Sequence, residues 1–166
     1  MRAAWIKDYN VSILRKDANM NCIEAAAERA IWVGRNIAYN LEFIPNDKLN
    51  WKPASSAHSV LEIIDHVARV VHGTISRIDG GDGQITFSSP QNCEEAQSLI
   101  LSCVNDYSIK LKDLTIQQWQ EPVSGTDEEI TWGRIHEFVI FDLCHHHGQI
   151  SYIQSLLGDA DVHFQM

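Results

Sequence analysis

Three consecutive histidines, His145, His146 and His147, follow Asp142 in a run that otherwise has the apolar pattern of a helix. In a helix, Asp142 and His146 are four residues apart and therefore lie on the same face, one turn apart. That face also carries a row of apolar side chains, Ile135, Val139, Ile150, Ile153 and Leu157. A carboxylate and an imidazole are thus predicted to point into an apolar interior, where each needs a polar partner. A divalent cation bound by both groups would be such a partner.

His66 is predicted to supply a third ligand to the same ion. It lies between Ile63 and Val70 on the apolar face of an earlier helical run, and helical bundles build metal sites from side chains on facing helices. Two histidines and a carboxylate leave positions open for water or substrate and suit Zn, Ni, Fe or Mn. The alternatives are a hydrogen-bonded structural role for His66, and for Asp142 a role as acceptor of a proton from a ligand histidine.

The neighbouring polar residues have other expected roles. His145 lies three residues after Asp142 and could rotate toward the same cavity, so it is the reserve ligand. His147 points about 100° away from His146 and is expected at the rim or the surface. Gln149 could line the pocket, hydrogen-bond a ligand or only pack. Four histidines have no partner pattern and are expected to be solvated or to cap helices: His58, His72, His136 and His163.

Four long helices are predicted to position these side chains. Apolar residues recur at helical spacing in four ranges: 21–43, 59–78, 92–114 and 130–158. The first three begin with Asn or Ser followed three residues later by Glu, the spacing of a capping box. Pro45 ends the first helix, the glycines of 79–90 end the second, and Gly158 ends the last. These patterns predict an all-α four-helix bundle.

The connections are expected to be less regular. The glycine-rich stretch 79–90 is interpreted as a flexible connection that could cover an active-site mouth, and Trp119 is placed in a loop. A short extended excursion is predicted around Ser124 and Gly125, before the last helix. Residues 1–20 and 159–166 are expected to form an N-terminal arm and a C-terminal tail around one domain, which spans 21–158.

Composition excludes several classes of function. The net charge of -9 argues against nucleic acid and acidic membrane surfaces as partners. No apolar run approaches the roughly 20 residues of a membrane helix, and the first residues lack a secretory signal, so a cytoplasmic location is expected. The cysteines form no C-x-x-C pair and are expected to be reduced, and all but the last to be small buried residues: Cys22, Cys93, Cys103 and Cys144.

Two blocks of the sequence carry a resemblance to a known family. They are W-K-P-A-S-S-A-H-S-V-L-E-I-I-D-H-V-A at 51–68 and H-H-H-G-Q-I-S-Y-I-Q-S-L-L-G at 145–158. The first is similar to the Trp-x-Pro loop and ligand-bearing helix of the DinB/YfiT-like proteins, and the second resembles their H-x-x-x-H-R-G-Q-I ending. In this register His146 matches the second histidine of the motif, His147 its arginine and Asp142 its first histidine.

The resemblance implies a metal-binding four-helix bundle that forms a homodimer, with His66, Asp142 and His146 as ligands. A carboxylate in place of the first histidine keeps a group able to bind metal, yet it shortens the reach and adds negative charge. The site is therefore either altered or vestigial in this chain. Family members include metal-dependent hydrolases and transferases that use low-molecular-weight thiols, so a small-molecule substrate is expected.

The sequence identifies no distinct catalytic residue. His145 and Glu137 are the candidates for a general base near the predicted site. The alternative to an enzyme is a non-catalytic metal-binding or stress-associated interaction bundle, whose acidic surface meets a protein partner. A bundle with a vestigial metal site is the third interpretation.

Overall fold

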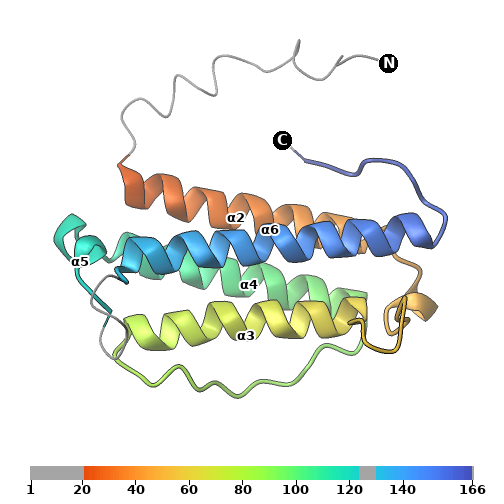
Figure 1. Ribbon diagram of the computed structural model, residues 1–166, viewed down its shortest axis with the longest axis horizontal. Helices are drawn as coiled ribbons and strands as arrows, with labels where there is room; N and C mark the ends of the chain where they lie inside the picture. Colours follow the sequence, from red (N-terminus) through yellow and green to blue (C-terminus); the bar gives the residue numbers. More distant parts are fainter. Residues whose placement is uncertain (1–20, 124–129, 166) are drawn as a thin grey trace, which may run out of the picture.

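The computed structural model describes residues 21–123 and 130–165, and four long helices form its core (Figure 1). The four are α2 (Cys22–Leu41), α3 (Val60–Ile78), α4 (Cys93–Lys112) and α6 (Trp132–Leu156). The connections hold a 3-10 turn, η2 (Asn46–Lys48), and a short helix, α5 (Ile116–Gln120). The predicted all-α four-helix bundle is confirmed. No helix of the described residues is long and apolar enough to cross a membrane.

Local capping interactions set the beginnings of the helices where the sequence placed them. Asn21 at α2 and Ser59 at α3 each form the complete reciprocal capping box that the spacing predicts. At α4 the side chain of Asn92 accepts from the backbone of Glu95, whereas the Glu95 carboxylate accepts from the backbone of Gln91. These bonds satisfy N–H groups that a helix leaves unpaired at its first turn.

The connection between α4 and α6 differs from the expected loop. Thr115 forms a capping box with Gln118, so Trp119 lies in the short helix α5. The Trp119 ring packs against the first turn of α6 at Gly133, where a Cβ atom would fall 2.5 Å from the indole nitrogen. The loop prediction for Trp119 was therefore wrong, because Thr115 and Gln118 have the capping-box spacing that starts a helix.

The predicted extended excursion is only partly described. Ser124 and Gly125 lie outside the described residues. Beside them, Pro122 and Thr131 form an isolated antiparallel β-bridge, and the backbone N–H of Val123 donates to the carbonyl of Ile130 at 2.8 Å. This bridge brings the chain back to the N-terminal end of α6.

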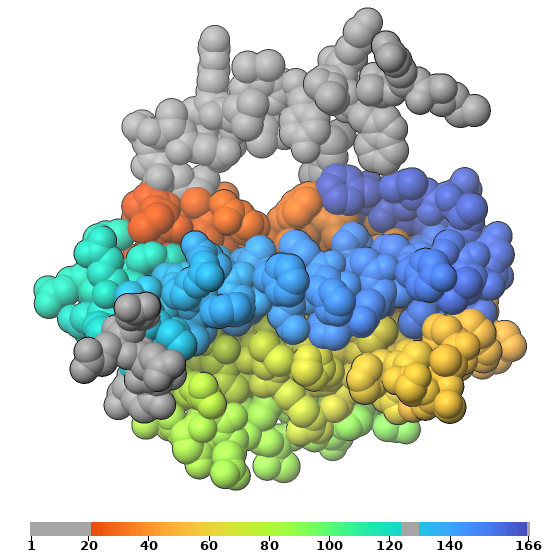
Figure 2. Space-filling model, viewed as in Figure 1, coloured from red at the N-terminus to blue at the C-terminus, as the bar shows by residue number. Residues whose placement is uncertain are grey.

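Helix α6 contacts α2 on one side and α3 on the other, and α4 closes the bundle against both. Figure 2, drawn from the same side as Figure 1, shows α6 as a band between α2 and α3. Gly34 lets α2 approach α4 closely, since a Cβ there would lie 2.6 Å from the side chain of Val104. All four cysteines are free; Cys103 is buried as expected, whereas Cys22 is exposed at the first turn of α2.

The C-terminal segment turns back along α2 (Figure 1). The Asn36 side chain accepts from the backbone N–H of Gln165 at 2.8 Å and donates to its carbonyl at 3.1 Å. Asn40 donates to the carbonyl of His163 at 3.2 Å, and the His163 ring stacks on Phe43. The prediction of a solvated or capping His163 was wrong, because the returning tail packs its ring against Phe43.

His136 is buried, whereas the sequence analysis expected it to be solvated or capping. Its side chain lies in the first turns of α6, and the residue is 3% exposed. Its Nδ1 is 3.4 Å from the hydroxyl of Tyr107 and its ring faces Trp119, but Nε2 has no hydrogen-bond partner in the described part of the chain. Burial lowers the pKa of His136 to about 4.

The fold should therefore lose stability as the pH falls below the ordinary histidine range. The unfolded chain takes up a proton at His136 near pH 6.5, but the folded protein does so only near pH 4. Protonation of the unfolded chain therefore lowers the free energy of unfolding through this pH window, by roughly 3 kcal/mol at its lower end. Urea unfolding at pH 6.5 and 4.5 should show a larger loss for the wild type than for His136→Phe. The exposed His58→Phe is the control, and an equal loss in all three proteins would contradict the assignment.

Candidate metal centre

His66, Asp142 and His146 come together where α3 faces α6. One ligand atom of each residue lies within 4.8 Å of the other two. His66 Nε2 is 3.8 Å from Asp142 Oδ1, and His146 Nε2 is 3.3 Å from the same oxygen. Ligand atoms that share one tetrahedral ion at ordinary bond lengths lie roughly 3.3–3.5 Å apart. The spacing from His146 to Asp142 is therefore that of two ligands of one ion, and the spacing from His66 to Asp142 is somewhat wider.

On α6 the two candidate ligands lie on the inward-facing side that the periodicity predicts. On α3 the periodicity predicts the position of the candidate ligand only in part. Asp142 and His146 are one turn apart on α6, which runs antiparallel to α3 (Figure 1). The side chain of His146 is 9% exposed and that of Asp142 is 27% exposed. The side chain of His66 is 51% exposed, so the prediction that it faces the core was wrong.

His66 is exposed because a hollow of about 400 Å³ lies beside it. The connection between α3 and α4 lines part of that hollow, through Ser89, Pro90 and Gln91. This connection thus forms one wall of a hollow that leaves His66 open, and its role as a cover over an active-site mouth stays a prediction. The candidate centre is accessible from the side of α3.

Gln149 orients His146 within the group. Its Oε1 lies 2.7 Å from His146 Nδ1, and because an amide oxygen only accepts, that nitrogen carries the proton. His146 Nε2 is thus directed at Asp142. The amide nitrogen of Gln149 donates to His145 Nε2 at 3.0 Å, so His145, the reserve ligand, lies outside the group of three. Of the roles expected for Gln149, the structure shows the hydrogen bond to a candidate ligand.

Asp142 and the two histidines are coupled electrostatically. Burial alone would raise the pKa of Asp142, but its contact with His146 and the nearby His66 outweigh burial, and the pKa lies below its usual value. Contact with Asp142 raises the pKa of His146, against burial. Asp142 Oδ2 is buried and has no hydrogen-bond partner among the described residues. An unpaired buried carboxylate oxygen is costly, so this atom fits a bound ion.

His147 has a structural position between α2 and α6. It is half-buried, and its Nε2 hydrogen-bonds Asn40 Oδ1 on α2. Burial lowers the pKa of His147. The prediction of a rim or surface position was wrong, because α6 is covered on two sides and a residue 100° from His146 meets α2.

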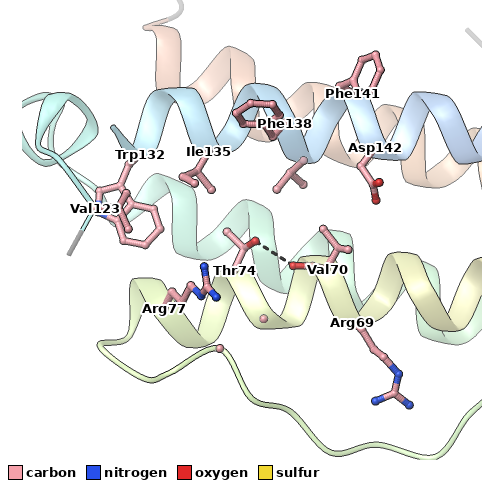
Figure 3. Close-up of a pocket in the computed structure, with 13 residues that line it drawn as sticks. Arg69, Val70, Thr74, Arg77, Val123, Trp132, Ile135, Phe138, Phe141 and Asp142 are labelled. Atoms are coloured by element: carbon pink, nitrogen blue, oxygen red, sulfur yellow. Dashed lines mark hydrogen bonds between the residues drawn. The ribbon is translucent and has the colours of Figure 1, made fainter. Parts of the chain in front are cut away.

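A groove of about 490 Å³ runs from Asp142 along the seam between α3 and α6 (Figure 3). Five α6 residues line one wall: Trp132, Ile135, Phe138, Val139 and Phe141. Five α3 residues line the other: Arg69, Val70, Gly73, Thr74 and Arg77. Val123 lies at the end away from Asp142, and Gly83 lies beside Arg77. The sequence analysis singled out neither arginine, although Arg77 stands eleven residues after His66 and so returns to the same helix face.

The fold and the site together define a class, the four-helix bundles with a candidate metal group between two facing helices. Residues 32–150 match the DinB superfamily, and the chain belongs to it. The chain is similar to the crystal structure of a DinB-like protein, YjoA, from Bacillus subtilis. That likeness has a TM-score of 0.70 at 17% identity and covers 86% of this chain and 99% of that one. At this identity it shows the fold alone. Comparison with curated proteins gives no match.

Proposed function

We propose that His66, Asp142 and His146 hold a divalent metal ion and that the protein is a metal-dependent enzyme acting on a small molecule. The two reaction classes proposed are hydrolysis and transfer of a low-molecular-weight thiol. The observation that carries the proposal is the buried Asp142 Oδ2, which has no hydrogen-bond partner in the described ranges. Membership of the DinB superfamily supports it.

A bound divalent cation supplies Lewis acidity to any further group that binds it. Residues of the chain would orient the candidate ligands and leave room for such a group. Gln149 holds the proton of His146 on Nδ1, and the hollow beside His66 leaves the site open to a small molecule. Glu137, a candidate base, pairs with Arg134 on an exposed part of α6, about 140° around the helix from Asp142. His145 is the nearer candidate, since Gln149 links it to His146.

A non-catalytic or vestigial site is the alternative, and one contact favours it. Asp142 and His146 lie 3.3 Å apart as an ion pair, so each charge has a partner before any ion binds. The wider spacing from His66 to Asp142, 3.8 Å, agrees with a site that has lost its third ligand. Homodimerisation, a protein partner and a cytoplasmic location stay predictions.

Elemental analysis separates these alternatives. Protein purified without a metal-affinity tag should contain about one divalent metal ion per chain, and a chelator should remove it. Metal-loaded and chelated protein are then compared in a thiol-transfer assay and in ester and amide hydrolysis assays. Activity that the chelator abolishes and added metal restores supports the enzyme. Bound metal with no turnover supports the non-catalytic site, and protein that binds no metal contradicts the metal centre itself.

A further inference from the structure

We propose that the groove between α3 and α6 binds an elongated apolar carboxylic acid, with Arg77 binding the carboxylate at the end away from Asp142. This inference deepens the proposed function and rests on it for the reacting end of the substrate. The binding of the acid itself depends on the groove and on Arg77, and it can be tested without metal.

Arg77 and His66 mark two ends of one face of α3. They are eleven residues apart, which is three turns plus about 20° and about 16 Å along the helix axis. Figure 3 shows Arg77 directed toward the seam, near Trp132, whereas Arg69 points away from α6. A molecule lying along the seam would therefore meet a cation at one end and Asp142 at the other.

The two arginines of the groove differ in their partners. Arg69 makes a two-point ion pair with Asp65, at 2.7 and 3.2 Å, and lies over the ring of Phe87. Arg77 has no carboxylate within ion-pair distance among residues 21–123 and 130–165. A planar guanidinium binds a carboxylate through two parallel hydrogen bonds. In a chain of net charge -9, a groove arginine that has no carboxylate partner among the described residues favours an anionic ligand.

The backbone around Arg77 is shaped to hold its side chain. Gly83 has a φ of +81°, in the left-handed region that favours glycine. A Cβ atom there would fall 2.6 Å from Arg77 Nε. Gly73 on α3 serves the same approach, since its Cβ would lie 3.1 Å from the carbonyl oxygen of Gly83. A side chain at position 83 would therefore displace the Arg77 side chain, which is exposed at this end of the groove.

The rest of the groove suits an apolar body. Trp132, Ile135 and Phe138 line the α6 wall opposite Arg77 and Thr74. The Thr74 hydroxyl donates to the carbonyl of Val70 at 2.9 Å, so its proton is already used within α3. A volume of about 490 Å³ lies within the usual range for small-molecule sites. The groove therefore provides one charged end and largely apolar walls.

The experiment compares 6-phenylhexanoate with 6-phenylhexanamide by isothermal titration calorimetry, on both metal-loaded and chelated protein. The wild type should bind the acid about tenfold more tightly than the amide, the difference expected of one good ion pair. In Arg77→Gln the two affinities should agree within about twofold, with the amide unchanged. Arg35→Gln, which removes an exposed arginine of α2, is the matched control and should keep the tenfold preference.

A second variant tests the position of the charge. Gly83→Ala keeps Arg77 but places a methyl group where the guanidinium lies, so it should also reduce the preference for the acid. Equal binding of acid and amide by the wild type would overturn the inference, and so would equal weakening of both ligands in Arg77→Gln. A preference for the acid in protein that binds no metal would support the groove while contradicting the proposed function. Bound metal without that preference would support the proposed metal site while contradicting the groove as a binding site for the acid.

Discussion

Replacing His146 by alanine should lower the affinity of the protein for zinc by roughly 100-fold or more. The substitution removes one of three candidate ligands and also frees Gln149, which orients the imidazole. Competition titration against a chromophoric zinc chelator measures the change directly. The same titration on His66→Ala should give a loss of similar size, because His66 is the candidate ligand that α3 supplies.

The adjacent histidine provides the control for this prediction. His145 is exposed, lies outside the group of three and bonds to the amide nitrogen of Gln149. His145→Ala should therefore change the zinc affinity by no more than about tenfold, the lower range for a residue that acts through a ligand's neighbour. A loss in His145→Ala as large as that in His146→Ala would make the reserve ligand the true one.

Replacing Asn40 by leucine should cost about 2–4 kcal/mol of the free energy of unfolding. Asn40 is 1% exposed and connects α2 to α6 and to the returning tail. Its amide nitrogen donates to Gln154 and to the carbonyl of His163, and its oxygen accepts from His147 and Ser151. Leucine has a similar volume but leaves these groups without their partner. Urea unfolding at pH 7 measures the loss.

Asn105→Leu is the matched control, because Asn105 is exposed on α4. That variant should stay within about 0.5 kcal/mol of the wild type. If Asn40→Leu costs no more than Asn105→Leu, the hydrogen bonds around Asn40 contribute nothing to stability, and the tail is held by the stacking of His163 on Phe43.

Features that depend on neighbouring residues could be predicted from the sequence. The capping boxes at Asn21 and Ser59 involve side chains three residues apart, and the structure has both. The pairing of Asp142 with His146 follows from one turn of helix and needs no knowledge of the fold. The bundle itself follows from four apolar-faced helices that must cover one another.

Features that depend on how fully neighbours cover a helix could not be predicted in this way. Periodicity places His66 on the apolar face of α3, but the hollow beside that face is a property of the assembled bundle. His147 is covered because α2 lies beside α6, which no spacing within α6 reveals. His136 is different, since it stands three residues before Val139 on the buried stripe, and that signal was available.

The candidate ligands are divided unequally between local and distant parts of the chain. Asp142 and His146 are neighbours as soon as α6 forms, whereas His66 stands 76 residues before Asp142 and reaches it only when α3 docks. An ion held by all three would cross-link α3 to α6, which are far apart in the sequence. Metal binding and assembly of the bundle would then be thermodynamically linked, so that each stabilises the other. An isolated α6 peptide would bind the ion only weakly, because it lacks His66.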